Sequence, residues 1–221
     1  MGFGIRVLAT GPRACFTRPE MKSERVSYDV ITPSAARGVL EAVYWKPAIC
    51  WKIDRIGVLN EIAFETFRRN ELGGKLSYAN AKAAFKSGKD VYISATEERQ
   101  QRATVLLRNV AYVIEAHFEL TDSAGETDTP EKHYNIAVRR LRKGQCFSQP
   151  YFGCREFPVD IELAEGMVPK SFYADIPEKD LGFMLYDMDF SDPVAPSPIF
   201  YRAVMRNGII NVAGSLDEVV K

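Results

Sequence analysis

Apolar and polar residues alternate along two stretches of the chain. In residues 4–10, Ile5, Val7 and Ala9 occupy every second position. Residues 104–120 are rich in β-branched and aromatic side chains, and the second half of this stretch alternates in the same way. A period of two is the pattern of a strand with one buried face. Both stretches are therefore predicted to be strands.

The period changes to that of a helix in residues 34–45, where apolar residues recur three and four positions apart. Thr32 is a favourable N-cap and Pro33 is a favourable first helical residue. Pro47 ends the pattern, because the residue before a proline avoids the helical conformation. Tyr44 follows Arg37 on the polar side of this helix, so it is predicted to face away from the aliphatic core.

The rest of the chain adds shorter elements. We expect one or two strands in 48–68, a short helix in 77–87, a basic helix in 131–143, and several short strands in 145–221. The order of elements in the first half is compatible with a ferredoxin-like unit, an antiparallel sheet with helices on one face. The predicted fold class is α+β. The polar loop 121–130 suggests a division into residues 1–125 and a β-rich C-terminal domain of residues 126–221.

Composition is that of a globular protein, with 46% apolar and 26% charged residues among 221. No apolar run approaches the roughly 18 residues of a membrane helix, and the first residues lack the apolar core of a signal peptide. We therefore expect a cytoplasmic protein with no membrane partner.

The net charge is zero, with 29 basic and 29 acidic residues, but the charges are unevenly distributed. Residues 1–110 hold 18 basic and 11 acidic side chains, and residues 131–158 hold 6 and 2. Residues 159–198 hold 2 basic and 9 acidic ones. Such asymmetry suggests a polyanionic partner, although a solvated charged face is the more common explanation.

The sequence gives no pattern for a metal or nucleotide cofactor. The four cysteines show neither C-x-x-C nor zinc-finger spacing, so we expect reduced thiols and no zinc site. Glycine-rich phosphate-binding motifs and the serine-hydrolase and zinc-protease motifs are also absent from the sequence.

Two histidines are present, and histidine is the side chain best suited to move protons near neutral pH. His117 lies on the polar side of the strand predicted in 104–120, between two glutamates. His133 opens the basic helix, where a structural or phosphate-facing role is expected rather than a catalytic one. The densest basic cluster is in the same helix and comprises Arg139, Arg140, Arg142 and Lys143. It suits phosphate contacts, or simply a solvated surface.

Three long runs carry a resemblance to a known family: ERVSYDVITPSAARGVLEAVYWKP, LLRNVAYVIEAHFEL and GQCFSQPYFGCREF. In this order they resemble the CRISPR-associated family numbered five, in its type I-C (Dvulg) subtype, over residues 3–210. The resemblance implies a ferredoxin-like (RRM-like) N-terminal domain and a smaller β-rich C-terminal domain. It also implies an endoribonuclease, independent of metal or cofactor, that cuts CRISPR repeat RNA at the base of its hairpin. The protein then stays with the crRNA 5′ handle as a subunit of the surveillance complex.

The resemblance also implies site residues. The family's active-site tyrosine matches Tyr44, and its histidine is matched here to His117. Some members carry a lysine just before the histidine, whereas Glu115 and Ala116 precede His117. Lys46 is the expected substitute in catalysis, and Arg37 is a second candidate. The residues expected to bind RNA are Arg25, Arg37, Arg108, Arg139, Arg140, Arg142 and Lys143.

Two alternatives remain open at this stage. One is a non-catalytic subunit that holds the crRNA 5′ handle, as family members do in other subtypes. The other is an unrelated RRM-like RNA binder, which is disfavoured because the sequence lacks a recognisable RNP signature.

Overall fold

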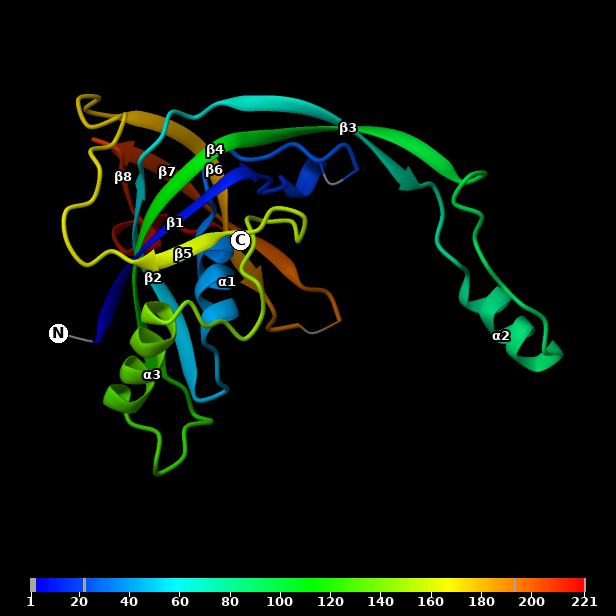
Figure 1. Cartoon of the computed structure of the whole chain (residues 1–221), viewed down its shortest axis with the longest axis horizontal. Helices are drawn as coiled ribbons and strands as arrows, with labels where there is room; N and C mark the ends of the chain where they lie inside the picture. The colour runs from blue at the N-terminus through cyan, green and yellow to red at the C-terminus, as the bar shows by residue number, and fades with distance from the viewer. Residues whose placement is uncertain (1–2, 22, 193, 221) are drawn as a thin grey trace.

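The computed structural model describes residues 3–21, 23–192 and 194–220, and it confirms the α+β class (Figure 1). The elements follow the order β1 (Gly4–Ala14), η1 (Pro19–Met21), α1 (Pro33–Val43), β2 (Ile49–Val58), β3 (Phe64–Leu72), α2 (Tyr78–Ser87), β4 (Arg99–Leu120), α3 (Pro130–Arg142), β5 (Asp160–Leu163), β6 (Lys179–Asp189), β7 (Ser197–Arg206), β8 (Ile209–Asn211) and η2 (Ala213–Glu218).

Four strands form the expected ferredoxin-like unit. They lie in the order β5-β1-β4-β2, and each neighbouring pair is antiparallel. Helices α1 and α3 make the two crossovers, between β1 and β2 and between β4 and β5. This unit extends through β5 and does not end at residue 125, the expected boundary, because β5 completes the sheet by pairing with β1.

The C-terminal strands continue the same sheet. Strand β8 pairs with the outer side of β2, and β7 and β6 follow it. Strand β6 packs against α1, which is also packed against β2. Helix α1 is therefore enclosed by the N-terminal unit and the β6–β7 hairpin (Figure 1).

The core lies between the sheet and helices α1 and α3. Val7 from β1 and Ile114 from β4 are fully buried there, as are Val39 and Leu40 of α1. Truncating the Ile114 or Leu40 side chain to alanine costs about 2–5 kcal/mol. The alternation predicted for 104–120 is confirmed, since Ile114 faces this core and its neighbours face the other side of the sheet.

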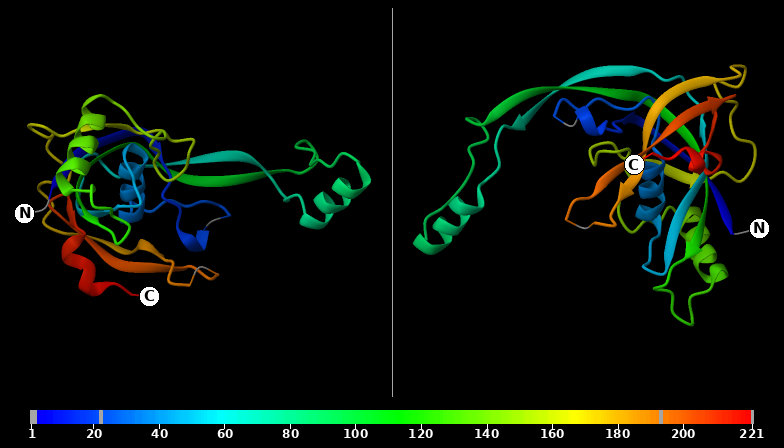
Figure 2. Two further views of the ribbon diagram at one scale, coloured as in Figure 1. Left: turned by 90° about the horizontal axis from the view of Figure 1, so that it is seen from below. Right: turned by 180° about the vertical axis from the view of Figure 1, so that it is seen from behind.

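Strands β3 and β4 leave the body as a long two-stranded arm that carries α2 at its far end (Figures 1 and 2). The helix predicted in 77–87 is present, with Ser77 as its N-cap. None of its described residues is buried, and Phe85 is 91% exposed. The arm thus presents apolar side chains to solvent.

Helix α1 begins as predicted, because the Thr32 hydroxyl accepts a hydrogen bond from the Ala35 backbone N–H at 3.2 Å. The helix ends earlier than residue 45. Its last residue is Val43, and Tyr44 has extended backbone geometry. This change of direction rotates Tyr44 off the polar side of the helix, and its side chain is buried at 2% exposure. The prediction that Tyr44 faces away from the core is therefore wrong.

Candidate active site

Tyr44 is held by its backbone at the C-terminal end of α1. Its N–H donates to the Leu40 carbonyl, and its carbonyl accepts from the Trp51 indole N–H at 2.8 Å. Trp51 lies on β2 and packs edge-on against Phe118 of β4. The tyrosine ring is thus fixed between the end of α1 and the helix-covered face of the sheet.

The partner of Tyr44 is His133, in the first turn of α3. The Tyr44 hydroxyl lies 2.7 Å from His133 Nδ1, in a buried hydrogen bond. His133 is 1% exposed, because it begins the apolar stripe that continues through Ala137 and Leu141 at four-residue intervals. Phe118 contacts the same imidazole edge-on. Helix packing therefore brings together two polar groups that are 89 residues apart in the chain.

The second ring nitrogen of His133 faces a carboxylate. Asp128 Oδ1 lies 3.2 Å from Nε2, an ion-pair distance, although the geometry is not that of an aligned hydrogen bond. The same oxygen accepts from Lys132 Nζ at 2.9 Å. Lys132 also donates to the Thr127 carbonyl, and its side chain is 43% exposed. The site therefore has a buried Tyr–His pair and an accessible rim of opposite charges.

A second cation lies over the tyrosine. The Arg140 guanidinium is 5.1 Å from the centre of the Tyr44 ring and donates to the Val43 carbonyl at 2.7 Å. Burial raises the pKa of Tyr44, while Arg140 and Lys132 act in the opposite direction. The Lys132 hydrogen bond lowers the pKa of Asp128, with help from the Gly125 N–H. The carboxylate is thus ionised and the tyrosine protonated at neutral pH.

Tyr44 and His117, both expected to act in catalysis, have different hydrogen-bond partners. His117 points to the opposite face of the sheet from Phe118, because successive residues of a strand alternate in direction. There its Nδ1 lies 2.8 Å from Asp54 Oδ1, whereas Phe118 contacts His133 on the face of Tyr44. Lys46, the expected third group, is exposed just beyond the end of α1. The residue adjacent to the bonded histidine is Lys132.

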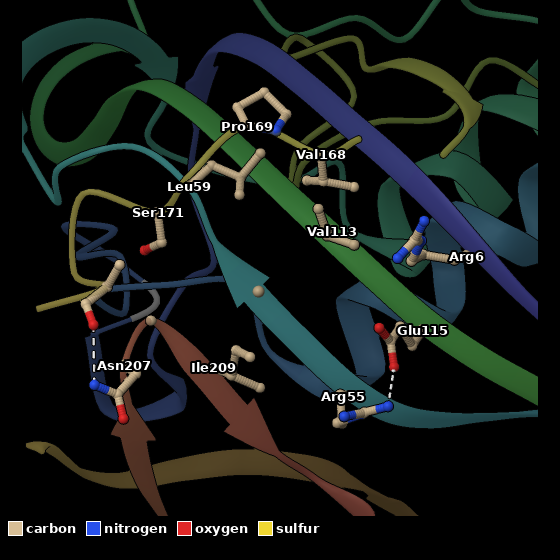
Figure 3. A pocket seen from close by; sticks show the side chains of 13 residues that line it. Arg6, Arg55, Leu59, Val113, Glu115, Val168, Pro169, Ser171, Asn207 and Ile209 are labelled. Atoms are coloured by element: carbon tan, nitrogen blue, oxygen red, sulfur yellow. Dashed lines mark hydrogen bonds and ion pairs between the residues drawn. The ribbon is translucent and has the colours of Figure 1, made fainter. Parts of the chain in front are cut away.

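A pocket of about 240 Å³ lies on the face of the sheet that the helices leave open (Figure 3). Its apolar wall includes Leu59, Val113 and Ile209. The ion pair of Arg55 with Glu115, at 2.7 Å, stands at one side. The pocket contains none of the residues expected to act in catalysis.

The sequence comparisons identify the family. The family described as CRISPR-associated protein (Cas_Cas5) matches residues 4–213. The chain belongs to the Cas5 family. This Cas5 chain is 50% identical over 223 residues to "CRISPR pre-crRNA endoribonuclease Cas5d" of Mannheimia succiniciproducens, covering 98% of each protein. It is 39% identical over 225 residues to the protein of the same name from Thermus thermophilus, covering 94% of this chain and 90% of the relative.

Solved structures share the fold of this chain. A structure titled "Crystal Structure of CRISPR-associated Protein" matches 99% of this Cas5 chain and 96% of its own, with a TM-score of 0.69 and 25% identity. A functionally uncharacterized protein from Streptococcus mutans shares the fold, with a TM-score of 0.68 and 23% identity.

Sequence reasoning missed the placement of His133 in this Cas5 chain. Two signals were available. His133, Ala137 and Leu141 share one helical stripe, which places the histidine on the buried side. In addition, Lys132 directly precedes His133, the order that the family resemblance describes.

The residues expected to bind RNA fall into two groups. Arg108, Arg139, Arg142 and Lys143 are exposed, although Arg142 pairs with Glu165. The other three are half-buried and held by the protein: Arg25 by Glu71 and Glu156, Arg37 by Asp187, and Arg140 by Val43. Acidic residues of 159–198 thus neutralise part of the basic surface.

Proposed function

We propose that this Cas5 chain is a metal-independent endoribonuclease that cuts CRISPR repeat RNA at the base of its hairpin. The relatives named pre-crRNA endoribonuclease, at 50% and 39% identity over nearly the whole chain, support the activity. The observation that carries the assignment of the site is the buried hydrogen bond between Tyr44 and His133.

The proposed reaction is an internal phosphoryl transfer. The ribose 2′-oxygen forms a bond to the adjacent phosphorus, and the bond from phosphorus to the 5′-oxygen of the next nucleotide breaks. The products are a 2′,3′-cyclic phosphate and a free 5′-hydroxyl. The enzyme has to accept the proton of the 2′-hydroxyl and supply one to the leaving oxygen.

Tyr44 and His133 act together as the proton acceptor. Because burial raises its pKa, Tyr44 does not ionise near neutral pH by itself. Its hydroxyl is bonded to the imidazole at 2.7 Å, so it can pass its own proton to Nδ1 as it takes the proton of the 2′-hydroxyl. A tyrosine without such a partner lacks this route.

Lys132 supplies the positive charge at the rim. It is the exposed member of the cluster, and its ammonium group is a hydrogen-bond donor with no acceptor capacity. It neutralises charge on the phosphorus oxygens and donates a proton to the leaving 5′-oxygen. Solvent then restores the starting protonation of Lys132 and His133.

The burial of Tyr44 and His133 requires an opening step. Residues 121–129 lead into α3 and bring Asp128 and Thr127 against Lys132. The RNA reaches the tyrosine when the Lys132 side chain leaves Thr127 and Asp128 to bind the phosphate, while Asp128 stays beside His133. Enzymes commonly complete their sites through such substrate-induced movements.

The test compares the two histidines. Wild-type protein, His133→Ala and His117→Ala are incubated with the cognate repeat RNA in EDTA, and the product ends are identified. Wild type and His117→Ala are expected to cut and leave a 2′,3′-cyclic phosphate, whereas His133→Ala is expected to bind without cutting. Loss of cleavage in His117→Ala alone would assign the reaction to the other face of the sheet.

We further propose that the chain remains in the cytoplasm as a subunit of a CRISPR surveillance complex. The arm supports this role, because Tyr78, Phe85 and Tyr92 are each at least 80% exposed along it. Clusters of exposed large apolar residues commonly mark protein interfaces. Among the described residues, no helix is long and apolar enough to span a membrane. The test is co-purification with the complex. The wild-type chain is expected to co-purify, and a variant that lacks residues 73–98 is expected not to. A wild-type chain that binds RNA without cutting it would instead be the non-catalytic subunit.

A further inference from the structure

Asp128 occupies a fixed position beside the buried imidazole. It precedes Thr129, the N-cap of α3, whose hydroxyl accepts from the Lys132 backbone N–H. The Asp128 carboxylate is held from two sides, because Oδ2 accepts from the Gly125 N–H at 3.0 Å and Oδ1 accepts from Lys132 Nζ at 2.9 Å. The carboxylate is therefore anchored before any contact with His133 is considered.

The position of Asp128 has a consequence for the imidazole proton. A neutral histidine carries one N–H, on either Nδ1 or Nε2. With the proton on Nδ1, the negative charge density of an unprotonated Nε2 would lie 3.2 Å from the Asp128 carboxylate, which is repulsive. With the proton on Nε2, the partial positive charge of this N–H lies near the carboxylate, although it is not aligned as a hydrogen bond, and Nδ1 is left as an acceptor for the Tyr44 hydroxyl.

We propose that Asp128 is a positioning residue that sets the His133 tautomer, and thereby makes Tyr44 the donor in the Tyr44–His133 hydrogen bond. This inference rests on the proposed function of that pair. The direction of the bond matters, because only a Tyr44 hydroxyl that donates to Nδ1 can pass its proton on while accepting another. Asp128 then faces the imidazolium that forms, as the carboxylate does in other histidine relays.

The other charges around the pair do not replace Asp128. Lys132 and Arg140 are both cations, and the first is bound to the carboxylate itself. When an RNA phosphate takes Lys132, the Asp128 carboxylate loses its competing partner. Its interaction with the imidazolium then strengthens at the moment when the proton is transferred. Asp128 thus couples phosphate binding to the relay.

The experiment uses imidazole ¹⁵N NMR, which distinguishes a protonated from an unprotonated ring nitrogen. The chain has two histidines, so the His117→Ala and His133→Ala spectra assign the signals. The variants are Asp128→Ala, which removes the carboxylate, and Asp128→Asn, which keeps an acceptor without charge. Asp122→Ala, an exposed acid on the same segment, is the matched control. Single-turnover cleavage and RNA affinity are measured on each protein.

We expect the wild type, Asp128→Asn and Asp122→Ala to carry the His133 proton on Nε2. Asp128→Ala should show the proton redistributed toward Nδ1 and a cleavage rate lower by about 100-fold, with RNA affinity within about threefold of wild type. Asp128→Asn should cut about tenfold more slowly, because its tautomer is kept while the charge is lost.

Two results would overturn the inference. One is an unchanged tautomer and rate in Asp128→Ala, while His133→Ala is inactive. The other, applicable if Asp128→Ala does not fold, is full activity in Asp128→Asn. If His133→Ala cuts RNA at the wild-type rate, the proposed function of the Tyr44–His133 pair fails, and not only the inference about Asp128.

Discussion

Arg140 is predicted to stabilise the fold through two contacts that its neighbour Arg139 lacks. Arg140 donates to the Val43 carbonyl at 2.7 Å and lies over the Tyr44 ring at 5.1 Å, whereas Arg139 is exposed. Val43 ends α1, where carbonyls have no partner within the helix. A hydrogen bond from a charged donor contributes about 1.5–3 kcal/mol, and a partly exposed cation–π contact about 0.5–1 kcal/mol.

Arg140→Met removes both contacts and should therefore lower the free energy of unfolding by about 2 kcal/mol. This value is near the lower end of the two contributions taken together, because Arg140 is only partly buried and water screens its charge. Arg139→Met should change it by less than about 0.5 kcal/mol. Urea denaturation followed by tryptophan fluorescence measures the stability of both variants. The slope of the unfolding free energy against urea concentration is expected to stay unchanged. An equal loss of stability in the two variants would refute the claim that Arg140 stabilises the fold through Val43 and Tyr44.

Four further predictions concern Tyr44, Arg37 and the binding of RNA phosphates. Tyr44→Phe should reduce cleavage about 10²- to 10⁴-fold in single-turnover assays, with RNA affinity within about threefold of wild type; near-normal cleavage would exclude the relay. Arg37→Gln should destabilise the fold by breaking its Asp187 pair, measured by thermal unfolding, and change RNA affinity less than Arg139→Met does. If about six phosphates are contacted, log affinity should fall with log salt at a slope near −4, and a slope near zero would contradict phosphate binding. Because the folded-state pKa of Tyr44 is raised, its contribution to stability is complete below the unfolded value of about 10 and is lost as pH rises through the higher folded value; urea unfolding across this range should show a smaller alkaline loss in Tyr44→Phe than in wild type.

Local sequence signals predicted the elements well, because they depend on neighbouring residues. The Thr32 cap and Pro33 placed the start of α1, and alternation placed the strand over 104–120. The end of α1 was less predictable. Tyr44 leaves the helix because Trp51 and Arg140 hold the backbone there, and these residues come from β2 and α3.

The candidate site was only partly predictable for the same reason. Tyr44 was predicted as a site residue, but its hydrogen-bond partner depends on how α3 packs beside the end of α1. His117 lies on the polar face of its strand, as the alternation predicted. The sequence does not show, however, that Tyr44 lies on the opposite side of the sheet. The apolar stripe through His133 was the local signal for the burial of this histidine beneath α3.

The most direct test of the account is cleavage of the repeat RNA in EDTA by the matched variants His133→Ala and His117→Ala. We predict that His117→Ala cuts at a rate within about tenfold of wild type and leaves a 2′,3′-cyclic phosphate. We predict that His133→Ala binds the RNA and leaves it intact, with a rate lower by at least about 10². Cleavage by His133→Ala at the wild-type rate would contradict the central claim.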